Sequence, residues 1–310
     1  HRFLKQFGGY TDSVGSYSFS AAEAILPHII GNWFTFLAGG LTAWPSIVDN
    51  TKLMVCFGGL PLKNGQVSHG GTGKHVQRNY MRAAKDNGCK FVNIGPIRAD
   101  TADFLEAQWL APVPGSDTAI MLGIAHTLVR ENLHDSDFLD KYCVGFDRFL
   151  PYLMGDSDGQ AKDADWAASL CGLPAGKLRE LARRMASHRT MISVSWSLQR
   201  QDHGEQPYWA ATTLAAMLGQ IGLPGGGIGY GYCADNAIGN HTGRFHWAGL
   251  EQGVNEVNTV IPVARIADML LNPGAEFDFN GRKYHYPDIR LIYWAGGNPF
   301  HHHQDLNRLC

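Results

Sequence analysis

Short apolar segments alternate with helical segments along most of this 310-residue chain, and the alternation limits the folds it can adopt. Apolar or extended runs with the length of buried strands lie at residues 53–57, 90–94, 109–113, 190–194 and 289–293. Helical periodicity occurs at residues 75–87, 118–131, 136–142, 163–171, 175–186, 207–218 and 261–271. Residues 222–231 are too rich in glycine for a regular element, which predicts a bend or a domain crossing. The alternation predicts an α/β fold with parallel sheets covered by helices on both faces.

The overall composition excludes several classes of protein. With 45% hydrophobic and 17% charged residues, the chain is typical of a globular protein. The formal net charge of -2 and the lack of a basic run argue against nucleic acid as a partner, because phosphate backbones need clustered Lys and Arg. No apolar run approaches the roughly 20 residues of a membrane span. The 6 cysteines are scattered without a C-x-x-C pair, so neither a zinc nor an iron–sulfur site is expected.

Polar residues gather directly after the expected strands. Residues 58–64 contain two glycines that permit close approach of a phosphate, and Lys63 supplies a positive charge. Residues 195–200 follow another strand with an indole, hydroxyls, an amide and a guanidinium. Because parallel strands place their carboxyl ends on one edge of a sheet, these groups are expected to converge on one crevice. The residues expected there are Lys63, Asn64, Ile94, Gly95, Gly115, Ser116, Asp117, Trp196, Ser197 and Arg200.

Some of these residues have an alternative interpretation as purely structural groups. Lys63 fits a basic surface loop as well as a phosphate site. Asp117 precedes an expected helix, so its carboxylate either caps the first turn or accepts two hydrogen bonds from guanine. Trp196 either stacks on a flat heterocycle or fills the core. Arg200 is harder to explain by packing, because buried arginines need partners.

The C-terminal run from Trp294 to Arg308 combines a glycine turn with three consecutive histidines. After the expected strand 289–293, the glycines would let the backbone approach a ligand. Asn298 and His302 then offer donors and acceptors beside the place where a nucleotide would lie. The alternative is a tight turn followed by a polar surface loop. Neighbouring residues of an extended run point to opposite faces, so the histidines are not expected to bind a metal.

Other motifs in the chain do not carry the chemistry that they superficially suggest. Residues 69–75 have the form of a Walker A loop, but Ser68 replaces the first glycine and His75 replaces the hydroxyl residue. Residues 229–234 fit a loose G-x-G-x-x-A form without a convincing helix after it, which disfavours a nicotinamide fingerprint. The absence of G-x-S-x-G and H-E-x-x-H leaves hydrolase activity without support.

Taken together, the chain resembles the molybdopterin-guanine-dinucleotide oxidoreductases that reduce S- and N-oxides. These are the dimethyl sulfoxide, trimethylamine N-oxide and biotin sulfoxide reductases. The similar segments follow the same order over essentially the whole chain, at residues 60–64, 93–98, 114–117, 195–200, 203–209, 219–227 and 294–308. Residues 8–10, 17–20 and 27–28 are nearest the biotin sulfoxide reductase branch. Gly95 departs from the pattern, because relatives often place an acid there.

The resemblance implies a dinucleotide-binding fold of two adjoining α/β domains. Residues 1–238 are expected to form an inserted domain that binds one guanine dinucleotide. Residues 239–310 are expected to be part of the neighbouring domain, which binds the other dinucleotide through Asn298 and His302. The implied cofactor is bis(molybdopterin guanine dinucleotide) molybdenum in a longer parent, with the isolated fragment expected to be empty. The chain begins at His1 and ends at Cys310, and both ends are expected to be cut, with the molybdenum ligand outside them.

The implied reaction is reduction of an S- or N-oxide by oxygen-atom transfer to molybdenum. Biotin sulfoxide, methionine sulfoxide, dimethyl sulfoxide and trimethylamine N-oxide are the implied substrates, and the fragment alone is expected to be inactive. The expected partners are this small oxide and an electron-donor protein or a reduced nicotinamide system. A cytoplasmic location is expected, with a periplasmic one as the alternative. A nicotinamide-dependent dehydrogenase and a catalytically silent nucleotide-binding fragment remain the alternative functions.

Overall fold

The computed structural model describes residues 1–31, 40–66, 73–240, 248–303 and 305–310, and the chain divides into two compact units. Unit 1 combines His1–Ser20 with Arg244–Cys310, and unit 2 comprises Ala21–Gly243. The predicted division after residue 238 is close to the second boundary. The structure differs at the N-terminus, where residues 1–20 belong with the C-terminal segment. They do so because β1 (Asp12–Val14) pairs in parallel with β7 (Val260–Pro262).

Unit 2 is built around a five-stranded parallel sheet with the strand order β4-β3-β2-β5-β6. The strands are β2 (Leu53–Phe57), β3 (Lys90–Ile94), β4 (Gln108–Leu110), β5 (Thr190–Val194) and β6 (Gly227–Tyr230). Every residue of β2 and β5 is buried, as expected for central strands with both faces covered. The apolar runs predicted at residues 53–57, 90–94 and 190–194 are confirmed as strands.

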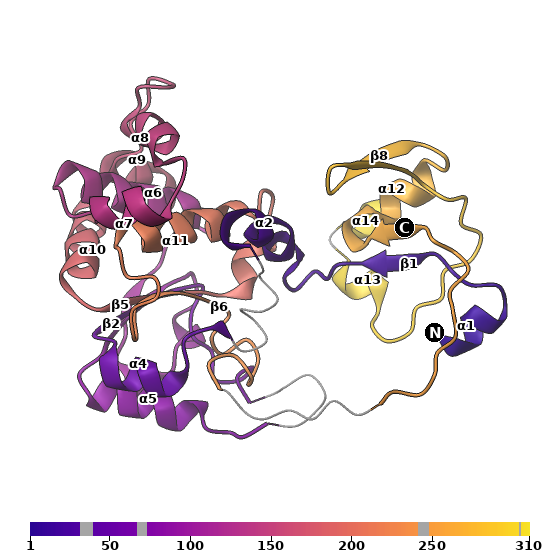
Figure 1. The fold of residues 1–310 in the computed structure, drawn as a ribbon, viewed down its shortest axis with the longest axis horizontal. Coiled ribbons are helices and arrows are strands. Elements are labelled where there is room, and N and C mark those ends of the chain that lie inside the picture. Colours follow the sequence, from indigo (N-terminus) through magenta and orange to yellow (C-terminus); the bar gives the residue numbers. More distant parts are fainter. Residues whose placement is uncertain (32–39, 67–72, 241–247, 304) are drawn as a thin grey trace. The chain divides into compact units, whose positions relative to one another are not determined.

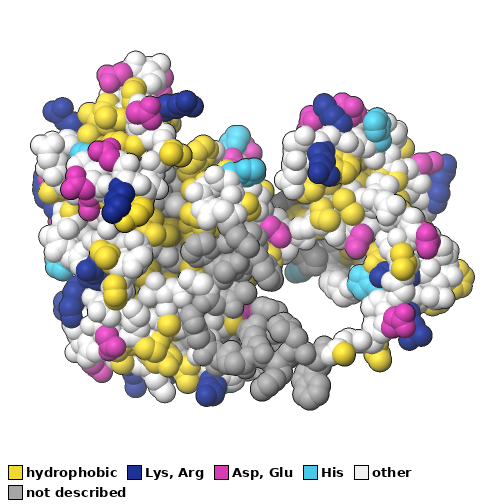
Figure 2. Space-filling model, viewed as in Figure 1, with side chains coloured by type: hydrophobic (Ala, Val, Ile, Leu, Met, Phe, Trp, Pro, Cys, Tyr) yellow, Lys and Arg dark blue, Asp and Glu magenta, His cyan; other side chains and the backbone are white. Residues whose placement is uncertain are grey.

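Helices cover both faces of this sheet. They include α4 (Trp44–Asn50), α5 (Gln77–Asp86), α6 (Asp117–Arg130), α10 (Ala175–Ser187) and α11 (Gln206–Met217). Figure 1 shows α4 and α5 on one face, with α6, α10 and α11 on the other. The predicted α/β class with a parallel sheet between helices is confirmed. On the face shown in Figure 2, acidic and basic side chains are interspersed over unit 2, in keeping with the near-balanced charge.

Helices α7 (Ser136–Tyr142), α8 (Phe146–Met154) and α9 (Ala164–Cys171) extend the layer that contains α6. Side-chain caps start two of them: Asp135 Oδ1 accepts a hydrogen bond from the Phe138 amide in α7, and Asp163 Oδ1 accepts one from the Trp166 amide in α9. Helix α6 lacks such a cap. Ser116 occupies its N-cap position, and Asp117 is already helical without a side-chain capping bond. The predicted N-cap role of Asp117 is therefore wrong.

Strand β6 corrects a second expectation. Residues 222–231 were expected to be irregular because of their glycines, yet Gly227–Tyr230 form the edge strand beside β5. A Cβ added at Gly229 would lie 2.0 Å from Tyr232 Cε2, so the glycine is needed for the tyrosine ring to pack against the strand. Tertiary packing therefore outweighs the weak strand propensity of glycine here.

Unit 1 is smaller and contains short elements. Its helices are α1 (Arg2–Gln6), α12 (Ile266–Leu271), α13 (Pro299–His302) and α14 (Leu306–Leu309), and α2 (Ser20–Ile30) begins at its boundary with unit 2. The antiparallel strands β8 (Glu276–Phe279) and β9 (Arg282–His285) place Phe277 in a core with Ile261, Met269 and Tyr286. The predicted helix 261–271 is shorter than expected, because Pro262 belongs to β7 and a 3-10 turn follows it.

The predicted strand at residues 289–293 is not formed in the described structure. Leu291 and Tyr293 are 84% and 72% exposed, and no described strand pairs with this segment. An apolar run becomes a strand only when a neighbouring strand satisfies its backbone groups. In the described parts of both units, no helix combines the length and the hydropathy that a membrane span requires.

Candidate functional site

The strand order of unit 2 creates a topological switch point between β2 and β5. The chain runs outward from β2 through β3 to β4, returns to β5, and continues outward to β6 on the other side. The loops after β2 and β5 therefore diverge, which leaves a crevice where open α/β sheets bind ligands. A cavity of about 150 Å³ lies there. Its walls are Gly58, Pro61, Lys63, Asn64, Asp100, Ser195, Trp196, Ser197, Arg200, Tyr232 and Ala234.

Gly58 brings the two loops of the crevice together. Its amide donates to the Ile94 carbonyl over 2.8 Å, and its φ of 82° lies in the left-handed region. A Cβ at this position would lie 2.4 Å from Leu198 Cδ1 and 2.7 Å from Ser195 Cβ. A glycine is therefore required at the end of β2 for the loop after β5 to approach it.

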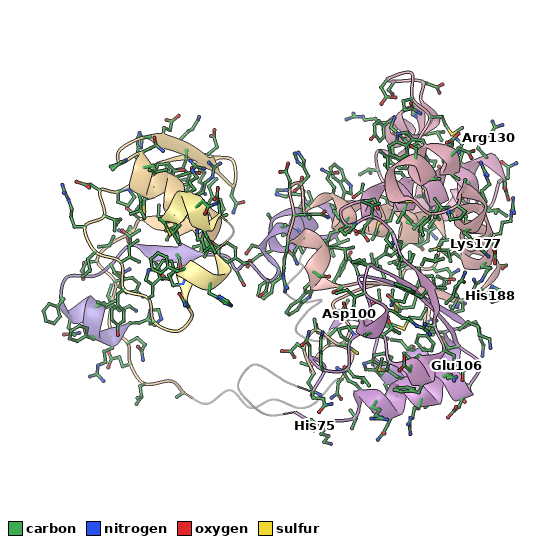
Figure 3. All side chains as sticks on the ribbon, turned by 180° about the vertical axis from the view of Figure 1, so that it is seen from behind. His75, Asp100, Glu106, Arg130, Lys177 and His188 are labelled. Atoms are coloured by element: carbon green, nitrogen blue, oxygen red, sulfur yellow. The ribbon has the colours of Figure 1, made fainter. Side chains whose placement is uncertain are left out.

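Two cationic side chains face the crevice from opposite loops. Lys63 Nζ lies 3.3 Å from Asp100 Oδ1, and the lysine side chain is 71% exposed. Figure 3 labels Asp100 on this part of unit 2. Arg200 is also exposed and forms no ion pair with any residue that the structure describes. The crevice thus presents a weakly held lysine and an uncompensated guanidinium, which together would attract an anionic group such as a phosphate.

Trp196 and Ser197 belong to the 3-10 turn η4 (Trp196–Gln199) that follows β5. Ser195 Oγ accepts hydrogen bonds from the Ser197 amide and hydroxyl, over 3.3 and 3.0 Å, and so caps the turn. A Cβ added at Gly231 would lie 2.1 Å from Trp196 Nε1, so the indole packs directly on that glycine. The contact with Gly231 therefore fits the packing interpretation of Trp196. The indole also lines the crevice, so stacking on a flat ligand stays a prediction.

Ile94 and Gly95 lie at the adjacent end of β3 and are not among the residues that line the cavity. Ile94 is fully buried, and a Cβ at Gly95 would lie 3.6 Å from the Gly58 Cα. Trp109 Nε1 donates to the Gly95 carbonyl over 2.9 Å and holds this loop in place. The sequence interpretation missed Trp109, since one indole on an edge strand carries no motif that would identify its partner.

Gly115, Ser116 and Asp117 lie beyond β4, outside the cavity walls. A Cβ at Gly115 would lie 2.9 Å from Gln201 Oε1, so this loop approaches the segment that follows Arg200. The Ser116 hydroxyl donates to the Val113 carbonyl over 2.6 Å. Burial raises the pKa of Asp117 to about 6, and its own backbone amide partly offsets this. Among the ten residues predicted to converge, the cavity walls contain Lys63, Asn64, Trp196, Ser197 and Arg200.

The predicted C-terminal contacts belong to unit 1. The Asn298 side chain accepts a hydrogen bond from the Phe300 amide over 3.1 Å and caps α13. The side chain of His302 lies outside the described residues. His303 is buried, accepts a hydrogen bond from the Asp305 amide through Nδ1, and packs edge-on against Tyr17. Roles of Asn298 and His302 toward a nucleotide stay predictions.

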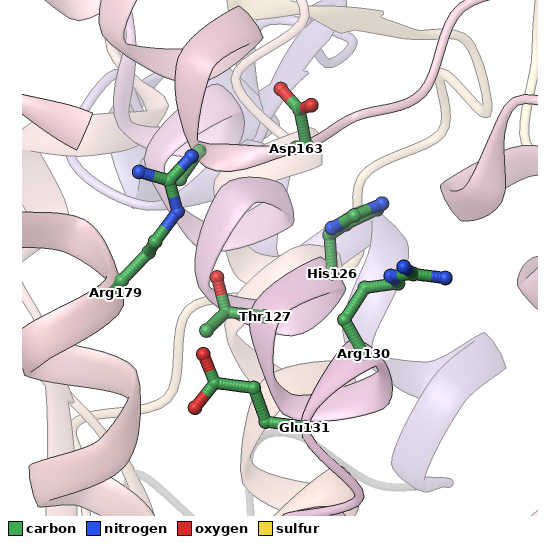
Figure 4. Close-up of a pocket in the computed structure, with 7 residues that line it drawn as sticks. His126, Thr127, Arg130, Glu131, Asp163 and Arg179 are labelled. Carbon is green, nitrogen blue, oxygen red and sulfur yellow. The ribbon is translucent and has the colours of Figure 1, made fainter. Parts of the chain in front are cut away.

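A second depression, of about 200 Å³, lies among helices α6, α9 and α10. His126, Thr127, Arg130, Glu131 and Asp163 face it together with Arg179 (Figure 4). Two of its four charged side chains are already paired: Glu131 accepts two hydrogen bonds from Arg183 at 2.7 Å, and Arg179 pairs with Asp165. The remaining Arg130 and Asp163 carry opposite charges, so the depression offers no net charge to a ligand.

Comparisons with known proteins extend over the whole chain. Residues 1–310 match the family model described as molybdopterin oxidoreductase. The chain is 46% identical to a dimethyl sulfoxide/trimethylamine N-oxide reductase of Cereibacter sphaeroides, over 99% of this chain and 38% of that protein. It is 44% identical to a biotin sulfoxide reductase of the same organism, over 99% of this chain and 41% of that protein. The chain thus spans about two-fifths of the length of these relatives.

Among solved structures, acetylene hydratase from Pelobacter acetylenicus aligns with 60% of this chain and 25% of that chain, with a TM-score of 0.45 and 24% sequence identity.

Proposed function

The chain belongs to the molybdopterin oxidoreductase family, and we propose that it is the part of an S- or N-oxide reductase that binds the guanine dinucleotides of a bis(molybdopterin guanine dinucleotide) molybdenum cofactor. Unit 2 would bind one dinucleotide in the crevice between β2 and β5. Unit 1 would contribute Asn298 and His302 to the site of the other. The observation that carries the proposal is the coincidence of the family match with a cationic crevice at the switch point.

The residues of the crevice fit a dinucleotide in their chemistry. Lys63 and Arg200 supply positive charge for a pyrophosphate, and the bare backbone at Gly58 permits close approach. Asn64 and Ser197 would hydrogen-bond the sugar or the phosphates. Trp196 offers an aromatic face to a flat ring. These roles would position the cofactor, which when bound supplies the oxygen-atom transfer and electron chemistry of the reaction.

Asp117 would recognise guanine through its carboxylate. Two carboxylate oxygens match the adjacent imino and amino N–H groups of guanine, whereas adenine presents no such pair. Since burial raises the pKa of Asp117 to about 6, the carboxylate is mainly ionised at pH 7. Two donated hydrogen bonds would stabilise the ionised form further, so binding would lower this pKa. Ile94, Gly95, Gly115 and Ser116 would shape the edge of the same site.

The whole enzyme would reduce a small oxide such as biotin sulfoxide, methionine sulfoxide, dimethyl sulfoxide or trimethylamine N-oxide. Identities of 46% and 44% to the two relatives do not separate these substrates. The preference for the biotin sulfoxide reductase branch stays a proposal that rests on the sequence of residues 8–10, 17–20 and 27–28. An electron-donor protein or a reduced nicotinamide system would supply the electrons. A cytoplasmic location is proposed, with the periplasm as the alternative.

The proposal is tested on the longer native protein that contains this chain. It would be purified, analysed for molybdenum, and denatured to identify released nucleotides. Molybdenum with about two guanine nucleotides per metal supports the proposal, as the cofactor contains two dinucleotides. Released NAD would indicate a dehydrogenase instead, and the absence of both metal and nucleotide would indicate a silent binding protein. In parallel, calorimetric titration of the 310-residue chain should show tighter binding of GDP than of ADP.

A further inference from the structure

The turn η4 presents Trp196 and Ser197 to the crevice, and Arg200 follows directly after it. A turn of four residues has few hydrogen bonds of its own, so its conformation depends on what surrounds it. Two buried side chains hydrogen-bond with each other beside the turn: Gln199, its last residue, and Tyr208 in α11. The sequence offered Gln199 only as an amide after the strand and did not single out Tyr208, and neither residue lines the cavity.

Tyr208 connects α11 to both ends of the turn. Its hydroxyl donates to the Ser195 carbonyl over 3.0 Å and accepts a hydrogen bond from Gln199 Nε2 over 3.1 Å. Gln199 Oε1 in turn accepts a hydrogen bond from the Ala22 amide in α2, over 2.9 Å. The chain of hydrogen bonds therefore runs from α2 through the end of the turn to its start.

Both side chains are removed from water. Tyr208 is 0% and Gln199 is 7% exposed. Burial raises the pKa of the Tyr208 phenol, so the hydroxyl stays a neutral donor at neutral pH. Loss of this hydroxyl would remove one buried hydrogen bond from the Ser195 carbonyl and one from the Gln199 amide, which costs more than the loss of a solvent-exposed bond.

We propose that Tyr208 and Gln199 are positioning residues of the nucleotide crevice, which hold η4 in the conformation that presents Trp196, Ser197 and Arg200 to the ligand. The inference rests on the proposed function, because the ligand is the guanine dinucleotide. The two residues would act through the turn and would not touch the nucleotide. Their removal would therefore lower affinity by letting the turn adopt conformations that do not bind.

Tyr230 provides a matched control in the same core. It is 1% exposed, its ring stacks on that of Tyr208 with centroids 5.8 Å apart, and its hydroxyl bonds Thr212 Oγ1 over 2.8 Å. No hydrogen bond of that hydroxyl reaches η4 among the described residues. Tyr230→Phe and Tyr208→Phe thus each remove one buried hydroxyl from the same stacked pair, but only the second releases the turn.

The test compares the wild-type chain with Tyr208→Phe and Tyr230→Phe, using calorimetric titration with GDP and hydrogen exchange of the peptide that covers residues 195–200. Tyr208→Phe should weaken GDP binding about five- to tenfold and speed exchange in this peptide. Tyr230→Phe should change affinity less than about twofold, even where its thermal stability falls equally. Gln199→Met, which is similar in size but lacks the amide, should reproduce the effect and replaces Tyr208→Phe if that variant does not fold.

A double-mutant cycle with Arg200→Ala separates positioning from general loosening of the core. If Tyr208 acts by presenting Arg200, its substitution should have a much smaller effect on affinity once Arg200 is absent, whereas independent effects would add. Unchanged exchange of residues 195–200 in both Tyr208→Phe and Gln199→Met would overturn the inference. If exchange is faster in the variants but neither the wild-type chain nor its cofactor-free longer parent binds GDP, the proposed function is refuted, whereas the role of Tyr208 and Gln199 in holding η4 stays supported.

Discussion

Replacing Gly58 by alanine should destabilise unit 2 by about 2–5 kcal/mol, from two separate causes. The residue has a φ of 82°, where an L side chain costs about 1–2 kcal/mol. The added Cβ would also lie 2.4 Å from Leu198 Cδ1 and 2.7 Å from Ser195 Cβ. The leucine methyl ends a flexible side chain and is able to move away. Ser195 Cβ is attached directly to the backbone at the cap of η4, so relief there requires a shift of the turn, at about 1–3 kcal/mol.

Gly88 isolates the steric part of this loss. Its φ of 90° is similar, but nothing lies within 4 Å of a Cβ added there. Gly88→Ala should therefore lose only the backbone contribution of about 1–2 kcal/mol. Urea denaturation of both variants, followed by circular dichroism, gives the difference in unfolding free energy. Calorimetric titration with GDP should show weaker binding for Gly58→Ala alone, because only that substitution displaces η4. Equal losses of stability for the two variants, with equal GDP affinity, would refute this reasoning.

Asp117→Asn should weaken guanine selectivity in GDP and ADP titrations, because an amide mismatches one guanine donor. Burial raises the folded pKa of Asp117 to about 6, above an unfolded value of roughly 3.9, so the folded state binds more protons between these values. The contribution of Asp117 to stability should therefore fall as pH rises through this window, and urea midpoints of Asp117→Asn should lack that decline. Lys63→Ala should change the unfolding free energy by less than about 1 kcal/mol, because its ion pair is exposed. The same variant should weaken GDP binding, and most strongly at low salt. Asp100→Ala, which frees the lysine from its ion pair, should strengthen GDP binding. The purified 310-residue chain should not oxidise reduced methyl viologen with biotin sulfoxide, dimethyl sulfoxide or trimethylamine N-oxide. It should also contain no molybdenum by mass spectrometry. Turnover by this chain would contradict the expectation.

The strands at the centre of unit 2 were predictable because local and tertiary preferences agree there. Residues 53–57 and 190–194 are apolar runs, and the sheet buries both of their faces. Residues 289–293 have the same pattern but no described strand as a neighbour, and Leu291 is 84% exposed. Composition alone does not distinguish these cases, because a strand is stabilised by a partner that lies elsewhere in the sequence.

The candidate site divides in the same way. The sequence by itself identified Lys63, Asn64, Trp196, Ser197 and Arg200, because each follows a strand and carries a side chain that binds polar or flat ligands. It did not identify the side chains that hold the site together. Trp109 and Tyr208 support the loops through single hydrogen bonds to the carbonyls of Gly95 and Ser195, and such pairings leave no local pattern.

What the sequence determined about this protein is its class of fold and the residue types available at the strand ends, because both follow from patterns spanning only a few positions. What only the tertiary structure decided is the adjacency of β2 and β5, two strands separated by more than a hundred residues. That adjacency places the loop after Gly58 against η4 and creates the crevice. The physical reason is that strand order depends on how helices of the whole unit pack over the sheet, which no segment of the chain specifies alone.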